Sequence, residues 1–206
     1  AGRSISDEKI DNIFASVGQN LREGHSAESE VILLETISAY HHSPDNFANL
    51  KRLLSFTLET TGRYKESLEV LRPFEDEETL GKLSIETQVR ITTQLAIAYN
   101  NLTDQPKAVT LLKTTLQKAE ENNLRQLSGT VDIALARVYR KLSEYPISRG
   151  YAQKGREHVR EDGNWLGMAD AYREIANTYH QEGNSEKSIE SFELGIKIIG
   201  GNSAPF

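Results

Sequence analysis

Cysteine is absent from the 206 residues, and proline is scarce, with five residues in the whole chain. The lack of cysteine excludes disulfide bonds, thiolate nucleophiles and cysteine-ligated zinc. Few prolines leave room for uninterrupted helices, because proline breaks a helix interior. There is also no run of about 18 apolar residues, so the sequence predicts no membrane-spanning helix.

The chain has a moderate share of charged residues and is slightly acidic overall. Hydrophobic residues make up 37% and charged residues 26%, which is typical of a folded, soluble chain. The formal net charge of -6 argues against attachment to nucleic acid or to an anionic membrane over a broad surface. We therefore expect no direct nucleic-acid partner and no membrane partner. A cytoplasmic location is expected, with the periplasm left open because proteins of both compartments can lack cysteine.

The amino end, AGRSISDEKIDN, lacks the apolar segment of a signal peptide. Its opening Ala-Gly pair is typical of what remains after a tag or a leader is removed. These features indicate a fragment or processed form of a longer protein. A catalytic or DNA-binding domain outside these residues is compatible with that interpretation.

A pattern with a fixed period runs through the second half of the chain. Three segments carry an aliphatic residue, then alanine, then tyrosine three positions later. The tyrosines are 40 residues apart both times, at Tyr99, Tyr139 and Tyr179. Around each one, large residues recur three and four positions apart, which indicates one face of an amphipathic helix. A period of this length is typical of a stacked repeat architecture.

Each of these helices is followed by a short polar break and a second amphipathic helix. Pro106 and Pro146 fall in the first turn of two second helices, where the missing N–H does no harm. The predicted unit is therefore an antiparallel helix pair. We expect one domain over residues 1–206 with repeats at 8–43, 44–80, 81–123, 124–163 and 164–199, a solvated acidic loop at 75–78, and a frayed tail at 200–206.

These residues resemble the tetratricopeptide repeat. The best match is ADAYREIANTYHQEGNSEKSIESFELGIKI, and GRYKESLEVL and AIAYNNL also match. The positions that carry the resemblance are Tyr172, Ile175, Ala176, Tyr179, Gly183, Ser188, Phe192 and Gly195. The period of 40 departs from the usual 34 of this family, and Thr103 and Ser143 stand where the family has a turn glycine.

The resemblance implies an all-α fold, a right-handed superhelical solenoid of about five antiparallel helix pairs. Its concave face is lined mainly by the first helix of each pair. The candidate peptide-binding residues on that face are Arg52, Arg90, Asn100, Asn101, Arg137, Arg140, Lys141, Arg173, Asn177 and His180. This set is basic and rich in amides although the protein is acidic.

Arginine binds carboxylates with a two-pronged hydrogen-bond pattern, and asparagine can bond an extended backbone. The face therefore suits a protein or peptide partner, with an acidic segment favoured. Arg173 and Asn177 resemble part of the family's carboxylate clamp, but they lie in the last repeat, which disfavours that use. We expect replacement of Arg137, Arg140 and Arg173 by Glu to abolish binding without changing the melting behaviour.

The five histidines show no spacing that would place two of them and a carboxylate on one helix face, so no metal site is expected. No phosphate-binding loop, nucleophile elbow or serine-histidine-acid arrangement can be recognised. The sequence thus predicts no cofactor and no enzymatic activity. Trp165 and Met168 are expected to pack on the preceding repeat, and the three tyrosines are expected in the core.

The sequence indicates a protein- or peptide-binding scaffold module within a larger regulatory or signalling protein. One alternative is the sensor or oligomerisation domain of a transcription regulator. A second alternative is a peptide-sensing phosphatase built on helical repeats. Self-association through the ends of the solenoid is a further expectation, because an uncapped end exposes apolar helix faces.

Overall fold

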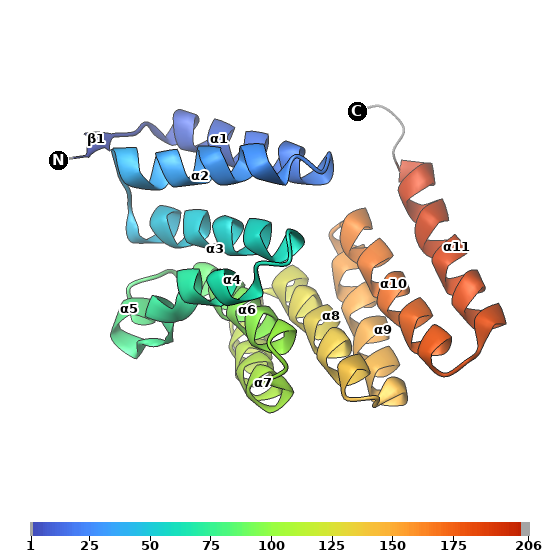
Figure 1. Ribbon diagram of the computed structural model, residues 1–206. Helices are drawn as coiled ribbons and strands as arrows, with labels where there is room; N and C mark the ends of the chain where they lie inside the picture. Colours follow the sequence, from blue (N-terminus) through green and yellow to red (C-terminus); the bar gives the residue numbers. More distant parts are fainter. Residues whose placement is uncertain (1, 203–206) are drawn as a thin grey trace. The chain divides into compact units, whose positions relative to one another are not determined.

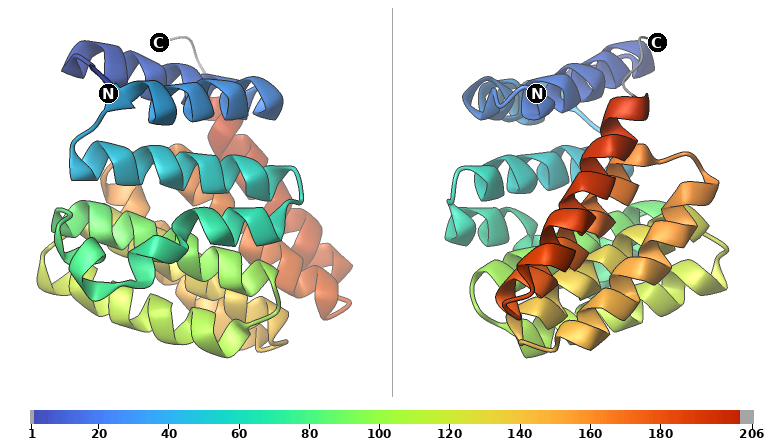
Figure 2. Two further views of the ribbon diagram at one scale, coloured as in Figure 1. Left: turned by 60° about the vertical axis from the view of Figure 1, so that its left-hand side comes forward. Right: turned by 90° about the vertical axis from the view of Figure 1, so that its right-hand side faces the viewer.

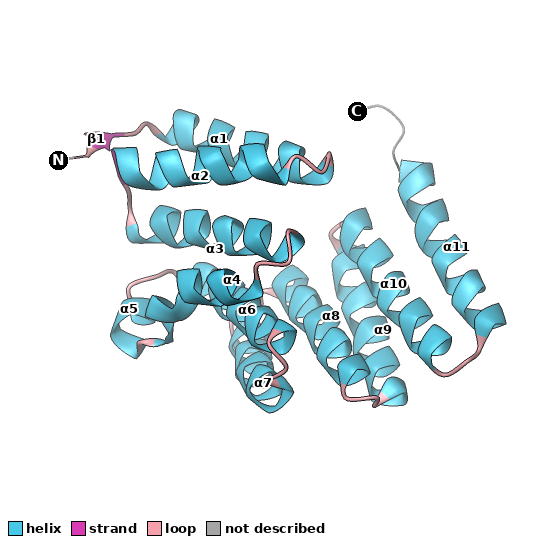
Figure 3. Cartoon of the chain, viewed as in Figure 1, coloured by secondary structure: helices cyan, strands magenta, loops and turns pink. Residues whose placement is uncertain are grey.

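Helices account for nearly all of the chain in the computed structural model, which describes residues 2–202, apart from the side chain of Asn202. The fold divides into two compact units, with the boundary between Thr103 and Asp104 in the turn after α6. Each unit is described by itself below. Figure 3 shows the preponderance of helix.

The first unit stacks successive helices on one another (Figure 1). Its helices are α1 (Asp7–Arg22), α2 (Ser26–Ala39), α3 (Pro44–Thr60), α4 (Tyr64–Leu71), the 3-10 turn η1 (Arg72–Glu75), α5 (Glu77–Gly81) and α6 (Ile85–Asn101). A two-residue strand, β1 (Arg3–Ser4), pairs in parallel with β2 (Tyr40–His41). α3 packs against α2, α4 and α6, so it is the centre of this unit.

The second unit contains two complete helix pairs. Its helices are α7 (Gln105–Glu121), α8 (Arg125–Lys141), α9 (Tyr145–Glu161), α10 (Trp165–Gln181) and α11 (Ser185–Asn202). Each helix packs on the next, and α10 also touches α8. Figure 2 shows α11 running beside α10 from two directions. The first helices α8 and α10 are therefore neighbours on one side of the unit.

The helix starts follow from local chemistry. The side chains of Ser43, Ser84 and Asn164 each accept a hydrogen bond from a backbone N–H in the first turn of the helix that follows. Proline stands in the first turn of α3, α7 and α9, as expected for Pro106 and Pro146. The predicted second-helix starts are thus confirmed.

The turns inside the helix pairs require a left-handed residue. Gly24, Gly62 and Gly183 adopt positive φ there, and Thr103 and Ser143 adopt the same conformation, with φ of 67° and 61°. For a residue with a Cβ atom this conformation costs roughly 1–2 kcal/mol. The missing turn glycines therefore leave backbone strain at these two positions.

Ser143→Gly is expected to stabilise the protein by about 0.5–1 kcal/mol, because glycine removes the left-handed strain but loses more entropy on folding. Urea denaturation measures the change. Ser143→Ala is the matched control, since alanine keeps the Cβ atom. An equal gain in both variants would show that the strain is not the cause.

Small residues let the two helices of a pair approach closely. Ser29, Ser67 and Ser148 are buried on second helices, and each hydroxyl bonds a backbone oxygen of the first helix twelve residues earlier. These bonds satisfy hydroxyls that would otherwise be costly to bury. The helix pair is thus held by the same contact in three repeats.

The all-α class and the antiparallel helix pairs are confirmed, and no described helix is long and apolar enough to cross a membrane. Residues 75–78 are exposed as predicted, but they are not a loop throughout: η1 ends at Glu75, and the short helix α5 begins at Glu77 with Asp76 as its cap. Part of the expected tail, residues 200–202, continues α11, and residues 203–206 lie outside the described residues. The single-domain organisation stays a prediction.

The core predictions for Trp165, Met168 and the three tyrosines are confirmed only in part, for Met168 and Tyr99. Met168 is buried with Ile133 and Val159, so it packs on the preceding repeat, whereas Trp165 is 37% exposed. Tyr99 is buried and its hydroxyl bonds Glu75. The rings of Tyr139 and Tyr179 are only partly buried. A cation from a neighbouring helix lies over each ring, Lys113 Nζ at 5.9 Å from the Tyr139 centroid and the Arg149 guanidinium at 4.4 Å from the Tyr179 centroid.

Candidate functional site

Two of the predicted arginines come together in the first unit. Arg52 on α3 and Arg90 on α6 are close enough for their charges to repel each other. Arg90 has a carboxylate partner, with 3.0 Å between its Nη2 atom and Glu86 Oε1. Arg52 has none among the described residues: its Nε–H donates to Asn49 Oδ1 over 3.3 Å. Arg52 is therefore a partly buried cation without a counter-charge.

The surroundings of Arg52 lower its pKa. Burial, and then the charge of Arg90, lower the pKa of Arg52 to about 10. Both causes disfavour a positive charge at this place. A carboxylate or another anion bound here would offset both effects by its attraction to the guanidinium. The local electrostatics thus favour an anionic ligand.

In the second unit, two predicted ligand-binding arginines are already occupied. Arg137 Nε donates to Glu174 Oε1 over 3.2 Å, and Arg140 Nε donates to Glu174 Oε2 over 2.9 Å. Glu174 is 2% exposed, so its charge depends on these two partners. Because Glu174 joins α10 to α8, the pair of arginines contributes to helix packing. The expectation that Glu at these positions would leave melting unchanged is therefore wrong.

The remaining predicted residues differ in how accessible they are. On α8 and α10, Lys141, Arg173 and His180 are not buried, and Asn177 is partly buried. Arg173 pairs with Asp170 over 3.0 Å on the same helix. Asn100, on α6 in the first unit, is fully buried, so its side chain is not on the surface as predicted.

Asn101, also on α6, is partly buried, and its Nδ2 atom makes no hydrogen bond within the described chain. The two amides at the end of α6 therefore have different environments.

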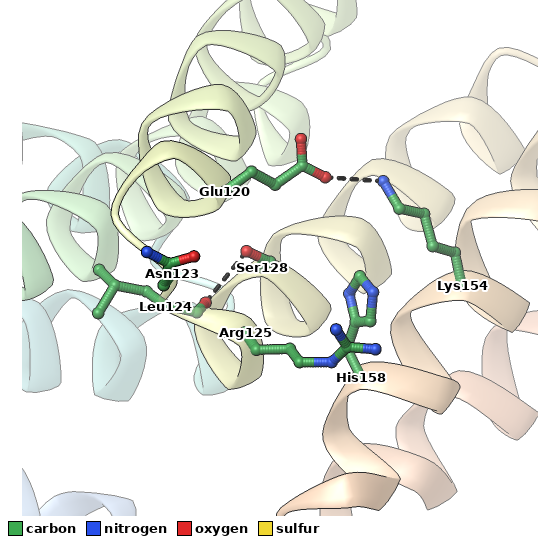
Figure 4. A pocket seen from close by; sticks show the side chains of 7 residues that line it. All are labelled: Glu120, Asn123, Leu124, Arg125, Ser128, Lys154 and His158. Carbon is green, nitrogen blue, oxygen red and sulfur yellow. Dashed lines mark hydrogen bonds and ion pairs between the residues drawn. The ribbon is translucent and has the colours of Figure 1, made fainter.

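A pocket of about 330 Å³ lies between α7, α8 and α9. Figure 4 shows Glu120, Arg125, Lys154 and His158 around it, with Lys154 reaching across to Glu120. That ion pair spans 2.9 Å. The lining residues are Glu120, Asn123, Leu124, Arg125, Ser128, Lys154 and His158. The sequence prediction missed this place.

Asp132 on α8 lies next to two of the residues that line the pocket, Lys154 and His158. It is 0% exposed, and neither of its oxygens makes a hydrogen bond in the described part of the structure. The nearest basic groups among the described residues are Lys154 Nζ at 3.7 Å and His158 Nδ1 at 3.5 Å. Burial raises the pKa of Asp132 to about 7, with Lys154 acting in the opposite direction and Glu120 in the same direction.

The helix crossing explains why Asp132 is buried. At Gly129 an added Cβ would lie 2.9 Å from the backbone oxygen of Gly155, and at Gly155 it would lie 2.7 Å from that of Gly129. Only two glycines allow α8 and α9 this approach. The repeat pattern of the sequence contains a signal that could have indicated this residue. Forty residues before and after Asp132 stand Thr92 and Tyr172, which carry no charge. An acid there departs from the pattern of the other repeats.

The Arg52–Arg90 pair and the pocket between α7, α8 and α9 both offer charged and hydrogen-bonding groups to a ligand. Within residues 2–202, no group of three or more His, Cys, Asp or Glu side chains is placed to hold a metal ion. No family model matches the chain, and no curated protein matches it closely in sequence.

Solved structures do match, at low identity. PlcR of Bacillus thuringiensis, in complex with the peptide PapR7 and DNA, has a TM-score of 0.78 at 14% identity, over 97% of this chain and 74% of PlcR. A Rap protein complexed with competence and sporulation factor has a TM-score of 0.75 at 14% identity, over 91% of this chain. This chain spans 53% of that Rap protein, about half of it.

BtubC of P. vanneervenii, another match, has a TM-score of 0.65 at 14% identity, over 97% of this chain and 83% of BtubC. Kinesin light chain TPR-like repeats of Podosopora anserina also match, with a TM-score of 0.59 at 16% identity over 94% of this chain and 96% of that one. The fold is therefore that of a tetratricopeptide-type helical repeat protein. The resemblance drawn from the 40-residue pattern is confirmed at the level of the fold.

Proposed function

We propose that this chain is a peptide-binding module that holds an acidic segment of a partner against Arg52 and Arg90 in the first unit. The observation that carries the proposal is the unpaired guanidinium of Arg52, partly buried beside a second arginine. Arg63, at the start of α4, in contrast pairs with both Glu30 and Glu66. The state of Arg52 is costly unless a ligand supplies the missing charge.

The geometry suits a carboxylate. Asn49 accepts the Nε–H of Arg52 and thereby orients the planar guanidinium. The two Nη groups are left for a carboxylate, which arginine binds through two parallel hydrogen bonds. Asn49 also donates from Nδ2 to Thr87 Oγ1 over 3.5 Å, so it is itself oriented from α6. A C-terminal carboxylate or an Asp or Glu side chain of a peptide meets these requirements.

Two structural neighbours support a peptide as the ligand class. PlcR is bound to the peptide PapR7, and the Rap protein is bound to competence and sporulation factor. A repeat fold of this kind offers a groove that can take an extended segment. We further propose that the module acts without catalysing a reaction, inside a larger regulatory or signalling protein of the cytoplasm.

Two alternative functions can be distinguished from peptide binding by experiment. A sensor domain of a transcription regulator would be accompanied by a DNA-binding domain in the full-length protein. A peptide-sensing phosphatase would turn over a phosphorylated substrate. Turnover by this chain in a phosphatase or hydrolase screen would contradict the proposal that it is not an enzyme.

The test uses an array of unstructured peptides with free C-terminal carboxylates, followed by fluorescence anisotropy with the peptide that binds best. We expect acidic peptides to be selected. Arg52→Gln should weaken binding by about 10- to 100-fold, the effect of losing a hydrogen-bonded charge. Its stability should not fall, because the variant removes an unpaired cation.

Arg22→Gln is the matched control, since Arg22 is exposed on α1 and its Nη2 atom donates a hydrogen bond to Gln19, three positions earlier on the same helix. That variant should bind as the wild type does. Selection of no peptide, or equal binding by the Arg52 variant, would exclude this site.

A further inference from the structure

The pocket between α7, α8 and α9 lies at the amino-terminal end of α8. α8 begins at Arg125, and the two residues before it, Asn123 and Leu124, also line the pocket (Figure 4). Leu124 is the residue that precedes the helix, and its side chain makes no hydrogen bond to the first turn. The first N–H groups of a helix have no partner inside the helix, and they lie at the positive end of its dipole. The start of α8 therefore offers this pocket donors that suit an anion.

Three basic side chains from α8 and α9 join these donors. Arg125, Lys154 and His158 all line the pocket. Arg125 pairs with Glu161 and Lys154 pairs with Glu120, but all four side chains are about half exposed, and such pairs are weak. Burial, and then the charges of Arg125 and Lys154, lower the pKa of His158, while Glu161 and Glu120 act less strongly in the opposite direction. At His158 the cations thus outweigh the acids.

Asp132 adds a buried acceptor that lacks a donor. It is 0% exposed, and neither of its oxygens makes a hydrogen bond in the described part of the chain. Those oxygens lie 3.7 Å from Lys154 Nζ and 3.5 Å from His158 Nδ1, so Asp132 is at the inner end of the pocket. A buried acceptor is costly unless a donor reaches it. An occupant that carries a hydrogen-bond donor would remove this cost.

These two requirements narrow the occupant. The start of α8, Arg125 and Lys154 favour an anion, whereas Asp132 favours a group that donates a hydrogen bond. Sulfate and carboxylates meet only the first requirement. An ammonium group would donate to Asp132, but Lys154 Nζ, 3.7 Å from the same carboxyl, would repel it. Hydrogen phosphate meets both requirements, because it is an anion that keeps a P–O–H group.

We propose that this pocket binds hydrogen phosphate, with its oxygens bound by Arg125, Lys154 and the first N–H groups of α8, and with its hydroxyl donating to Asp132. The pocket, of about 330 Å³, is large enough for this ion and several water molecules. It lies wholly in the second unit, so it is distinct from the peptide site at Arg52 in the first unit.

Titration of the full chain with inorganic phosphate at pH 8, followed by ¹H–¹⁵N NMR, tests the proposal. The pKa of Asp132 is about 7, so at pH 8 its carboxyl is mainly ionised and acts as an acceptor. Inorganic phosphate keeps a proton at this pH and sulfate has none. Phosphate should therefore bind about 10-fold or more tightly than sulfate at equal ionic strength. The amide signals of Gln126 and Leu127, in the first turn of α8, should shift on binding.

The cations are tested by Arg125→Gln and Lys154→Gln, each of which should weaken phosphate binding by about 10-fold. Arg160→Gln is the matched control. Arg160 is exposed on α9, pairs with Glu157 and does not line the pocket, so this variant should bind phosphate as the wild type does. Phenyl phosphate has lost the proton of its phosphate group at pH 8 and should bind as weakly as sulfate, which distinguishes free phosphate from a phosphate ester.

Asp132→Asn separates the carboxyl from the cations. Asparagine presents an N–H group to phosphate and sulfate alike, so the variant should keep anion binding but lose the preference for phosphate. Arg52→Gln should leave phosphate binding unchanged, which keeps this result independent of the peptide site. Absence of phosphate binding at millimolar concentration overturns the proposal. Equal binding of phosphate and sulfate by the wild type, or a preference for phosphate that survives in Asp132→Asn, also overturns it.

Discussion

Arg140→Glu is expected to lower the free energy of unfolding by about 3–5 kcal/mol, the order of the cost of removing one partner of a buried ion pair. Arg140 is one of two cations that hold Glu174, and its Nε lies 2.9 Å from the carboxylate. The variant would replace this attraction by repulsion between two carboxylates. Glu174 is 2% exposed, so water cannot take over the role of the arginine. Chemical denaturation followed by circular dichroism measures the loss.

Arg173→Glu is the control for charge reversal on the same side of the unit. Arg173 pairs with Asp170, and both side chains are about half exposed, at 51% and 50%. An exposed pair contributes only about 0–1 kcal/mol, so this variant should stay close to the wild type. Adding Glu174→Met to Arg140→Glu should restore much of the stability, since the buried carboxylate of this ion pair is then absent. Equal losses for Arg140→Glu and Arg173→Glu would contradict the buried ion-pair assignment.

Asp132→Asn is expected to remove a pH dependence of stability that the wild type shows between about pH 4 and 7. The pKa of Asp132 rises from 3.8 to about 7 on folding, mainly because of burial. Between these values the folded state binds a proton that the unfolded state has lost. Stability from this group is therefore greatest at low pH and falls as the pH rises through 7.

The size of this effect follows from the shift. One pKa unit corresponds to about 1.4 kcal/mol, so Asp132 accounts for up to roughly 4 kcal/mol lost by pH 8. Asp132→Asn should thus be more stable than the wild type at pH 8, and the difference should shrink toward pH 4. Urea denaturation at a series of pH values measures both curves.

His158 acts with the opposite sign and must be considered beside Asp132. Burial, together with Arg125 and Lys154, lowers the pKa of His158 from 6.5, while Glu161 and Glu120 oppose this change. Below pH 6.5 the unfolded state then binds more protons, so stability from His158 rises with pH. The difference between wild type and Asp132→Asn reports the carboxyl group together with its effect on His158, which lies 3.5 Å away.

Glu190→Gln is the control, because Glu190 is exposed on α11 and its loss should leave the pH profile unchanged. Parallel profiles for the wild type and Asp132→Asn would show that the buried carboxyl does not titrate in this range.

Residue types on the first helices were predictable, but their partners were not. Arg52 and Arg137 are both arginines on the same predicted face. One makes no ion pair with a described carboxylate, and the other is bound to a buried glutamate. Glu174 is 37 residues from Arg137 in the chain, so no local pattern indicates their contact. The site prediction therefore named both, and only the spatial arrangement separates a ligand-binding cation from a packing cation.

The burial of Asp132 could not be predicted from the sequence either. The sequence shows that the equivalent positions of the neighbouring repeats carry no charge, yet an acid on a helix is usually solvated. Its burial depends on how closely α8 and α9 cross, and the crossing depends on Gly129 and Gly155 together. The spacing of residues along one helix does not predict how closely two helices approach each other.

The sequence by itself determined the helical class, the 40-residue repeat and most helix starts, because helix periodicity and capping depend on residues within a few positions of one another. Tertiary structure alone decided which charges are paired and which acid is buried. These outcomes depend on distances between residues that are 20 or more positions apart in the chain.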